Sequence, residues 1–252
     1  MTSSTGDSRR MRIPGPHRAD IAAVVVALGF PTLMTWVYFV GLADSPAGLQ
    51  QTAMTVGKVL QFAFPLVWVL AIQRRRLAWS RPNVRGLAWG AGSGLLVLAA
   101  ALFVYHGWLK PEGVLREAGE AIVKKVVGFG IHNWPQYAAL GVFYSLVHSL
   151  LEEYYWRWFV FGQLRRLTSV GTAIAVSSLG FMAHHVVVLS HYFGLLSVPT
   201  LMFSLAVAAG GAFWAWLYHK SDSLYGPWLS HLLVDAAIFI VGYEMVRGAL
   251  GG

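Results

Sequence analysis

The sequence predicts an all-α fold, a polytopic integral membrane helical bundle of about seven transmembrane helices. Only 12% of the 252 residues are charged and 56% are hydrophobic, whereas soluble domains carry about 25% charged residues. Long stretches also lack any Asp, Glu, Lys or Arg, the longest of them residues 167–219. Because about 20 apolar residues are enough to cross the hydrocarbon core of a bilayer, such stretches are typical of membrane-spanning helices.

The uncharged stretches divide into seven spans. They are predicted at residues 20–42, 52–73, 86–109, 134–162, 169–190, 197–219 and 226–247. The fifth and sixth are separated near Gly194 and Pro199, which interrupt a helical pattern. The spans form a single transmembrane domain over residues 20–250, preceded by a basic cytoplasmic tail at residues 1–19.

The distribution of basic residues predicts the topology. Arg residues cluster before the first span, between the second and third, and after the fourth, whereas the loops after the first and fifth spans carry no Lys or Arg. Cytoplasmic loops are enriched in Lys and Arg, so we expect a cytoplasmic N-terminus. The net charge of +8 then reflects topology and contact with the lipid bilayer, and no nucleic-acid partner is expected. The composition and short loops favour a bacterial plasma membrane, and they predict no oligomeric state.

The segment of residues 111–130 has the pattern of a short amphipathic helix. Its apolar residues fall on one side and its charged residues on the other. A helix of this kind lies in the plane of the membrane interface. We interpret it as an interfacial helix packed on the bundle, with a gate for substrate as the alternative.

Ionisable side chains near the ends of spans need no special role, because long side chains can reach the interface. Lys58, about one turn into the predicted second span, is interpreted in this way. The histidines at the span ends are interpreted likewise; they are His106, His191 and His219.

The fourth span carries charges well inside it, where each costs about 2.5–3.5 kcal/mol on insertion scales. They are Glu152, Glu153 and Arg157. Glu153 and Arg157 lie four residues apart in the acid-first order, which predicts an ion pair on one helical face. Glu152 projects about 100° away from Glu153 and shares a face with His148, so we expect Glu152 to face the bundle interior.

The fifth and seventh spans add imidazoles and a further carboxylate. Phe181 and His185 share a face of the fifth span, while His184 points elsewhere. His231 and Asp235 lie one turn apart in the seventh, a spacing that lets the carboxylate orient the imidazole. Each residue alone is equally well explained by helix packing. Together the groups suit a general base with an activated water, a metal site or a proton relay.

Three motifs carry a resemblance to a known family. Glu152–Arg157 fits EExxxR, Phe181–His185 fits FxxxH, and His231–Asp235 fits HxxxN/D. In that order on successive hydrophobic helices, they resemble the CPBP family of intramembrane proteases. That family contains the type II CAAX-prenyl endopeptidases and the bacterial bacteriocin-processing and self-immunity enzymes. The resemblance covers residues 130–250, which would be the catalytic core.

The resemblance implies a role for each motif residue. Glu152 would be the general base that activates a water molecule, and His185 would help to hold or deprotonate that water. His231 and Asp235 would stabilise the oxyanion or position the substrate carbonyl. The family often has Asn at the last position; because an ionised Asp cannot donate a hydrogen bond, Asp235 would instead orient His231. The supporting residues, which shape the site and balance its charge, would be Glu153, Arg157 and Phe181.

We therefore expect an intramembrane endopeptidase that cleaves a membrane-associated protein or peptide without a cofactor, at a site in the cytoplasmic half of the bilayer. A second reading is a zinc peptidase. Its ligands would be Glu152, His185, His231 and Asp235, whose types suit zinc, although no HExxH signature is present. A third reading is a non-catalytic transporter or membrane scaffold, although no inverted repeat of the transporter kind is visible.

Overall fold

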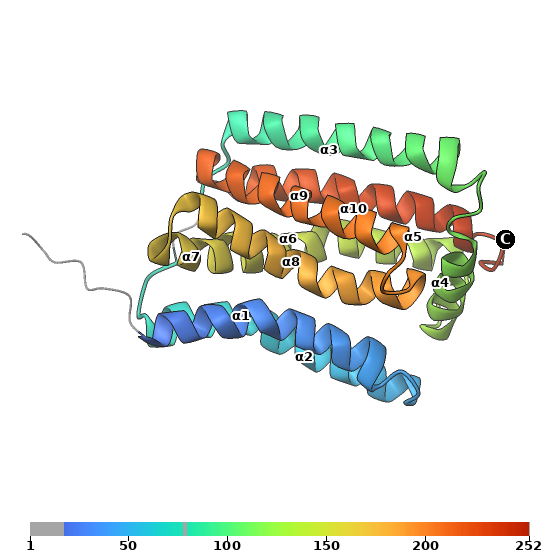
Figure 1. The fold of residues 1–252 in the computed structure, drawn as a ribbon, viewed down its shortest axis with the longest axis horizontal. Helices are drawn as coiled ribbons and strands as arrows, with labels where there is room; N and C mark the ends of the chain where they lie inside the picture. The colour runs from blue at the N-terminus through green and yellow to red at the C-terminus, as the bar shows by residue number, and fades with distance from the viewer. Residues whose placement is uncertain (1–17, 78–79, 252) are drawn as a thin grey trace, which may run out of the picture.

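The computed structural model describes residues 18–77 and 80–251, which form an all-α bundle (Figure 1). These ranges contain no strand, so the predicted fold class is confirmed. Most of the predicted basic tail, residues 1–17, lies outside the described residues.

The bundle is built from long helices, several of which continue into π-helical turns labelled η. The α-helical segments are α1 (Arg18–Trp36), α2 (Ala47–Val67), α3 (Val84–Val104), α4 (Arg116–Gly128), α5 (Trp134–Val142), α6 (Ser149–Glu153), α7 (Gly162–Leu167), α8 (Val170–Phe193), α9 (Val198–Ser221) and α10 (Tyr225–Val246). The π-helical segments are η1 (Val37–Gly41), η2 (Trp68–Ile72), η3 (Tyr105–Leu109), η4 (Phe143–His148) and η5 (Tyr154–Phe161).

Six helices of the described chain are long and apolar enough to cross a membrane. They are Arg18–Gly41, Ala47–Ile72, Val84–Leu109, Val170–Phe193, Val198–Ser221 and Tyr225–Val246. They coincide with the predicted first to third and fifth to seventh spans, and they make this an integral membrane protein.

The predicted fourth span is a run of helical segments rather than one uniform helix. It passes through α5, η4, α6, η5 and α7, from Trp134 to Leu167. This run is not one of the six helices that qualify as membrane spans by length and composition, so the predicted count of seven spans is not confirmed. The physical reason is its polar content, because the run carries the charged residues of the candidate site near its centre.

The helices are stacked in an order that differs from their order in the sequence. α3 packs along α10, α8 packs along α9, and α1 covers α8 on the opposite side from α3 (Figure 1). Glycines allow the closest approach. A Cβ atom on Gly90 of α3 would collide with the backbone of Gly226 in α10, and one on Gly94 would meet Leu233. Small residues of this kind let membrane helices approach closely.

The two ends of the bundle differ in composition. At one end, which we call the α4 end, α4 lies against the last turns of α10, and Lys125 of α4 reaches Gln50 near the start of α2 (Figure 1). At the other end Gln73, just after η2, donates to Asp20 of α1 and to Gln163 of α7. The second end is arginine-rich, because it carries the run of residues 74–76 and the pair of residues 165–166.

Candidate active site

The polar residues of the site are held by an aromatic core around η5. Tyr155, Trp156 and Phe159 of η5 are buried, as is the neighbouring Phe181 of α8. The Tyr155 hydroxyl donates to the carbonyl oxygen of Ala27 in α1, 2.8 Å away. This packing fixes the rotation of the Trp134–Leu167 run, and therefore the directions in which its charged residues point.

Glu153 is completely buried and has two partners. Its Oε2 lies 3.1 Å from Nε of Arg157, so the ion pair predicted from their spacing is present. Its Oε1 lies 2.8 Å from Nδ1 of His231 in α10. Glu153 therefore links the Trp134–Leu167 run to α10.

Arg157 lies between aromatic rings as well as against Glu153. The centre of its guanidinium group lies 4.6 Å from the ring of Phe181 and 5.1 Å from that of Trp214 in α9. Trp214 also stacks on His231, with ring centres 4.2 Å apart. Because cations are attracted to aromatic faces, these rings help to hold a charge that has been taken out of water. α9 carries none of the motif residues, yet it supplies a wall of the site.

Glu152 is buried among three imidazoles. Its Oε1 lies 3.6 Å from Nε2 of His184 and 4.0 Å from Nε2 of His148, while its Oε2 lies 3.7 Å from Nε2 of His231. Arg157 is paired with the other glutamate. Two polar atoms 3.6–4.0 Å apart can both contact one small molecule such as water, since each hydrogen bond to it spans about 2.8 Å.

The histidine of α8 that approaches Glu152 is His184, whereas the sequence pattern predicts its neighbour His185. Nδ1 of His185 instead lies 2.9 Å from the carbonyl oxygen of Phe181 on its own helix. The ring of His184 is stacked parallel to that of Trp156. The two histidines are adjacent, so one residue of register turns the side chain by about 100° around the helix. The pattern FxxxH selects His185, and no signal in the sequence favours His184 over it.

Asp235 lies near His231, but it is not the carboxylate that fixes the ring. Oδ1 of Asp235 is 3.6 Å from Nε2 of His231, whereas Glu153 holds Nδ1 at 2.8 Å. The prediction pairs Glu153 with Arg157 and assigns the orientation of His231 to Asp235, and it does not include the contact between Glu153 and His231. The reason is tertiary, since the contact between Glu153 and His231 joins residues far apart in the sequence.

The site lies near the middle of the helices that build it. Glu152 belongs to the run from Trp134 to Leu167, and Asp235 belongs to α10. At a helical rise of about 1.5 Å per residue, Glu152 is about 27 Å from the start of its run and about 22 Å from the end. By the same rise, Asp235 is about 15 Å from the start of α10 and about 16 Å from its end.

The site is most accessible on the side that faces the α4 end. The side chains of His148 and Asp235 are 18% and 17% exposed, compared with 5% for Glu152 and His231. His148 lies one turn from Glu152, and Asp235 one turn from His231, in each case toward the α4 end. A substrate would therefore meet His148 and Asp235 first.

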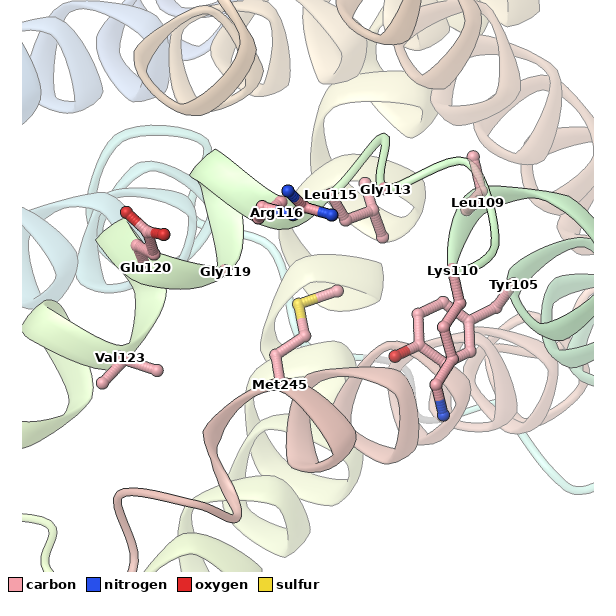
Figure 2. Close-up of a pocket in the computed structure, with 10 residues that line it drawn as sticks. All are labelled: Tyr105, Leu109, Lys110, Gly113, Leu115, Arg116, Gly119, Glu120, Val123 and Met245. Atoms are coloured by element: carbon pink, nitrogen blue, oxygen red, sulfur yellow. The ribbon is translucent and has the colours of Figure 1, made fainter.

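A cavity of about 430 Å³ lies elsewhere, at the α4 end, between the end of η3, α4 and the last turns of α10 (Figure 2). It is lined by ten residues, namely Tyr105, Leu109, Lys110, Gly113, Leu115, Arg116, Gly119, Glu120, Val123 and Met245. None of the predicted site residues is among them.

The predicted zinc ligands do not fit a metal site in this arrangement. Within residues 18–77 and 80–251, no three His, Asp or Glu side chains are grouped so that they could hold a metal ion.

Comparison with known proteins gives one match. Residues 133–237 match the family model described as type II CAAX prenyl endopeptidase Rce1-like. The chain matches no curated protein and no solved structure. The matched segment contains the glutamates of α6, the histidines of α8, and His231 and Asp235 of α10, and it ends before the last turns of α10. Residues 133–237 therefore match an Rce1-like domain, which supports the resemblance of this segment to the CPBP family of intramembrane proteases.

Proposed function

We propose that this protein is a glutamate-type intramembrane endopeptidase that needs no metal ion and hydrolyses a peptide bond in a membrane-associated protein or peptide. The observation that carries the proposal is the contrast between the two adjacent glutamates. Glu153 is engaged by Arg157 and His231, whereas the ion-pair contacts of Glu152 among the described residues are with imidazoles, none within hydrogen-bonding distance. Glu152 is therefore the carboxylate left to act on a water molecule.

In the proposed reaction, a water molecule shared by Glu152 and His184 attacks the carbonyl carbon of the scissile peptide bond. Glu152 accepts a proton from that water as general base. His231, held at Nδ1 by Glu153, presents Nε2 toward the site, where in its protonated form it donates a hydrogen bond to the developing oxyanion. When the C–N bond breaks, the proton on Glu152 passes to the leaving amine, and the products are a carboxylate and an amine.

The substrate would be anchored in or on the bilayer. The site lies at the middle of membrane-length helices and is most accessible through His148 and Asp235. A lipid-anchored or membrane-spanning peptide can approach such a site laterally, and the matched family is described as a CAAX prenyl endopeptidase.

The proposal can be tested with purified protein reconstituted in liposomes that contain a library of lipid-anchored peptides. Mass spectrometry of the products should reveal cleavage by the wild type and a loss of about 10²–10⁴-fold in the Glu152→Gln variant. Glu244→Gln is the matched control, because it makes the same chemical change on α10 at the α4 end, where Glu244 pairs with Lys110. Its activity should equal that of the wild type.

Two results would point to the other readings. If extensive treatment with a chelator abolishes cleavage and zinc restores it, the reaction depends on a metal ion. If Glu152→Gln and His231→Ala both process the substrate at the wild-type rate, the polar residues serve a transporter or scaffold instead.

A further inference from the structure

Lys58 of α2 is a charged residue at membrane depth for which neither the site nor the matched family segment provides a use. The predicted second span begins at residue 52, which puts Lys58 near its end. The helix in fact begins at Ala47. Lys58 is therefore about 16 Å from that end, about half the thickness of the hydrocarbon core. At this depth a charged lysine side chain has a high free-energy cost, so such residues are usually paired or functional.

Lys58 has no carboxylate partner among the described residues. None of their ion pairs or side-chain hydrogen bonds includes it. Its Nζ lies instead 5.5 Å from the centre of the Phe62 ring. Arg157, at similar depth, differs in being paired with Glu153. The charge of Lys58 is therefore left for a group that comes from outside the protein.

Lys58 lies beside the accessible side of the site. Phe62, which contacts its ammonium group, lies edge-on to His148 at 6.2 Å, and His148 in turn approaches Glu152. Lys58 also lies one turn closer to the α4 end than Phe62, because α2 runs away from that end. A substrate that passes His148 would pass Lys58 as well.

We propose that Lys58 binds a carboxylate group of the substrate, on the α4-end side of the scissile bond, and so selects peptides that carry such a group near the cleavage site. The inference rests on the proposed proteolytic function. A carboxylate suits an ammonium group that acts as a point charge. Lipid phosphates lie at the interface, about 16 Å away along the helix, and so do not supply the anion. The carboxylate comes either from the C-terminus of the peptide or from an Asp or Glu side chain.

The experiment measures binding and cleavage of matched lipid-anchored peptides in liposomes. One pair differs only in having a C-terminal carboxylate or carboxamide, and a second pair differs only in having Asp or Asn at an internal position. Binding is measured on the Glu152→Gln background, so that it does not depend on catalysis. The proteins compared are that background itself and the same background with Lys58→Gln, Lys58→Arg or, as a control at the α4 end, Lys125→Gln.

We expect the background protein to bind the carboxylate member of at least one pair about tenfold or more tightly than its neutral counterpart. Lys58→Gln should remove that preference, while Lys58→Arg and Lys125→Gln should keep it. The pair that responds identifies the source of the carboxylate. The values of kcat/KM with Glu152 present should follow the same pattern.

The proposal is overturned if the background protein shows no preference within either pair, or if Lys58→Gln keeps the preference. If Lys58 only balances charge, Lys58→Gln should weaken the binding of both members of a pair equally. That result also overturns the proposal. A preference in binding without any cleavage by the wild type would instead contradict the proteolytic function alone.

Discussion

Nδ1 of His231 lies 2.8 Å from Oε1 of Glu153, so the carboxylate that balances Arg157 also fixes the imidazole of α10. This single contact connects the first and last motifs of the site across the bundle. It leaves Glu152, one residue earlier, facing three imidazoles. Two adjacent and identical side chains thus differ in their surroundings, although both approach His231.

Loss of either partner of the buried ion pair should destabilise the protein strongly. Arg157→Ala leaves the fully buried Glu153 without its guanidinium partner, which costs about 3–5 kcal/mol. Thermal unfolding in detergent or nanodiscs measures the effect. Arg247→Ala is the control, because Arg247 is largely exposed and lies 4.0 Å from Glu244; it should cost less than about 1 kcal/mol. Equal stabilities of the two variants would show that the buried pair is not needed for folding.

The two adjacent histidines of α8 should differ sharply. His184→Ala removes the imidazole 3.6 Å from Glu152 and should lower kcat/KM by about 10²–10⁴-fold. His185→Ala removes a ring that contacts the backbone carbonyl of Phe181 and should lower it by less than about tenfold. Peptide cleavage by the two purified variants measures the difference. The reverse order would favour the residue selected by the FxxxH pattern.

Asp235 should be less sensitive to substitution than Glu153. Asp235→Asn keeps a polar group beside Nε2 of His231 and should reduce kcat/KM by no more than about tenfold, whereas Glu153→Gln loosens both Arg157 and His231 and should reduce it by about 10²-fold or more. Steady-state kinetics of the two amide variants, together with their thermal stability, measures this difference. A greater loss in Asp235→Asn would assign the orientation of His231 to Asp235 after all.

The contact between α3 and α10 should tolerate no side chain at Gly90. A Cβ atom there would meet the backbone of Gly226, which cannot move as a flexible side chain would. Gly90→Ala should therefore destabilise the protein by about 1–3 kcal/mol. Gly92→Ala is the matched control on the same helix, because a Cβ atom there has nothing within 4 Å. If both variants unfold at the wild-type temperature, α3 and α10 can move apart without loss of stability.

The sequence is most informative where a property belongs to a single helix. Uncharged stretches locate the six membrane helices, and the spacing of Glu153 and Arg157 predicts their ion pair. Both depend only on composition or on helical geometry. The spacing of His148 and Glu152 likewise places them on one face, although spacing alone assigns His148 no role.

The sequence-based predictions fail where they depend on how two helices pack against each other. The rotation of α8 decides whether His184 or His185 approaches Glu152, and it is set by packing against Trp156 and Phe181. The second partner of Glu153 comes from α10, which no local pattern identifies. The depth of Lys58 depends on where α2 begins, and helix ends are the least certain feature of any sequence pattern.

The ion pair within the Trp134–Leu167 run also bears on how the chain is inserted into the bilayer. Glu153 and Arg157 enter together and neutralise each other before any later helix has been synthesised. Glu152 gains the imidazoles of His184 and His231 only when α8 and α10 arrive, and α9 must bring Trp214 to cover Arg157 and His231. A nascent chain that stops before α10 therefore carries Glu152 without His231, so the site is complete only at the end of biogenesis.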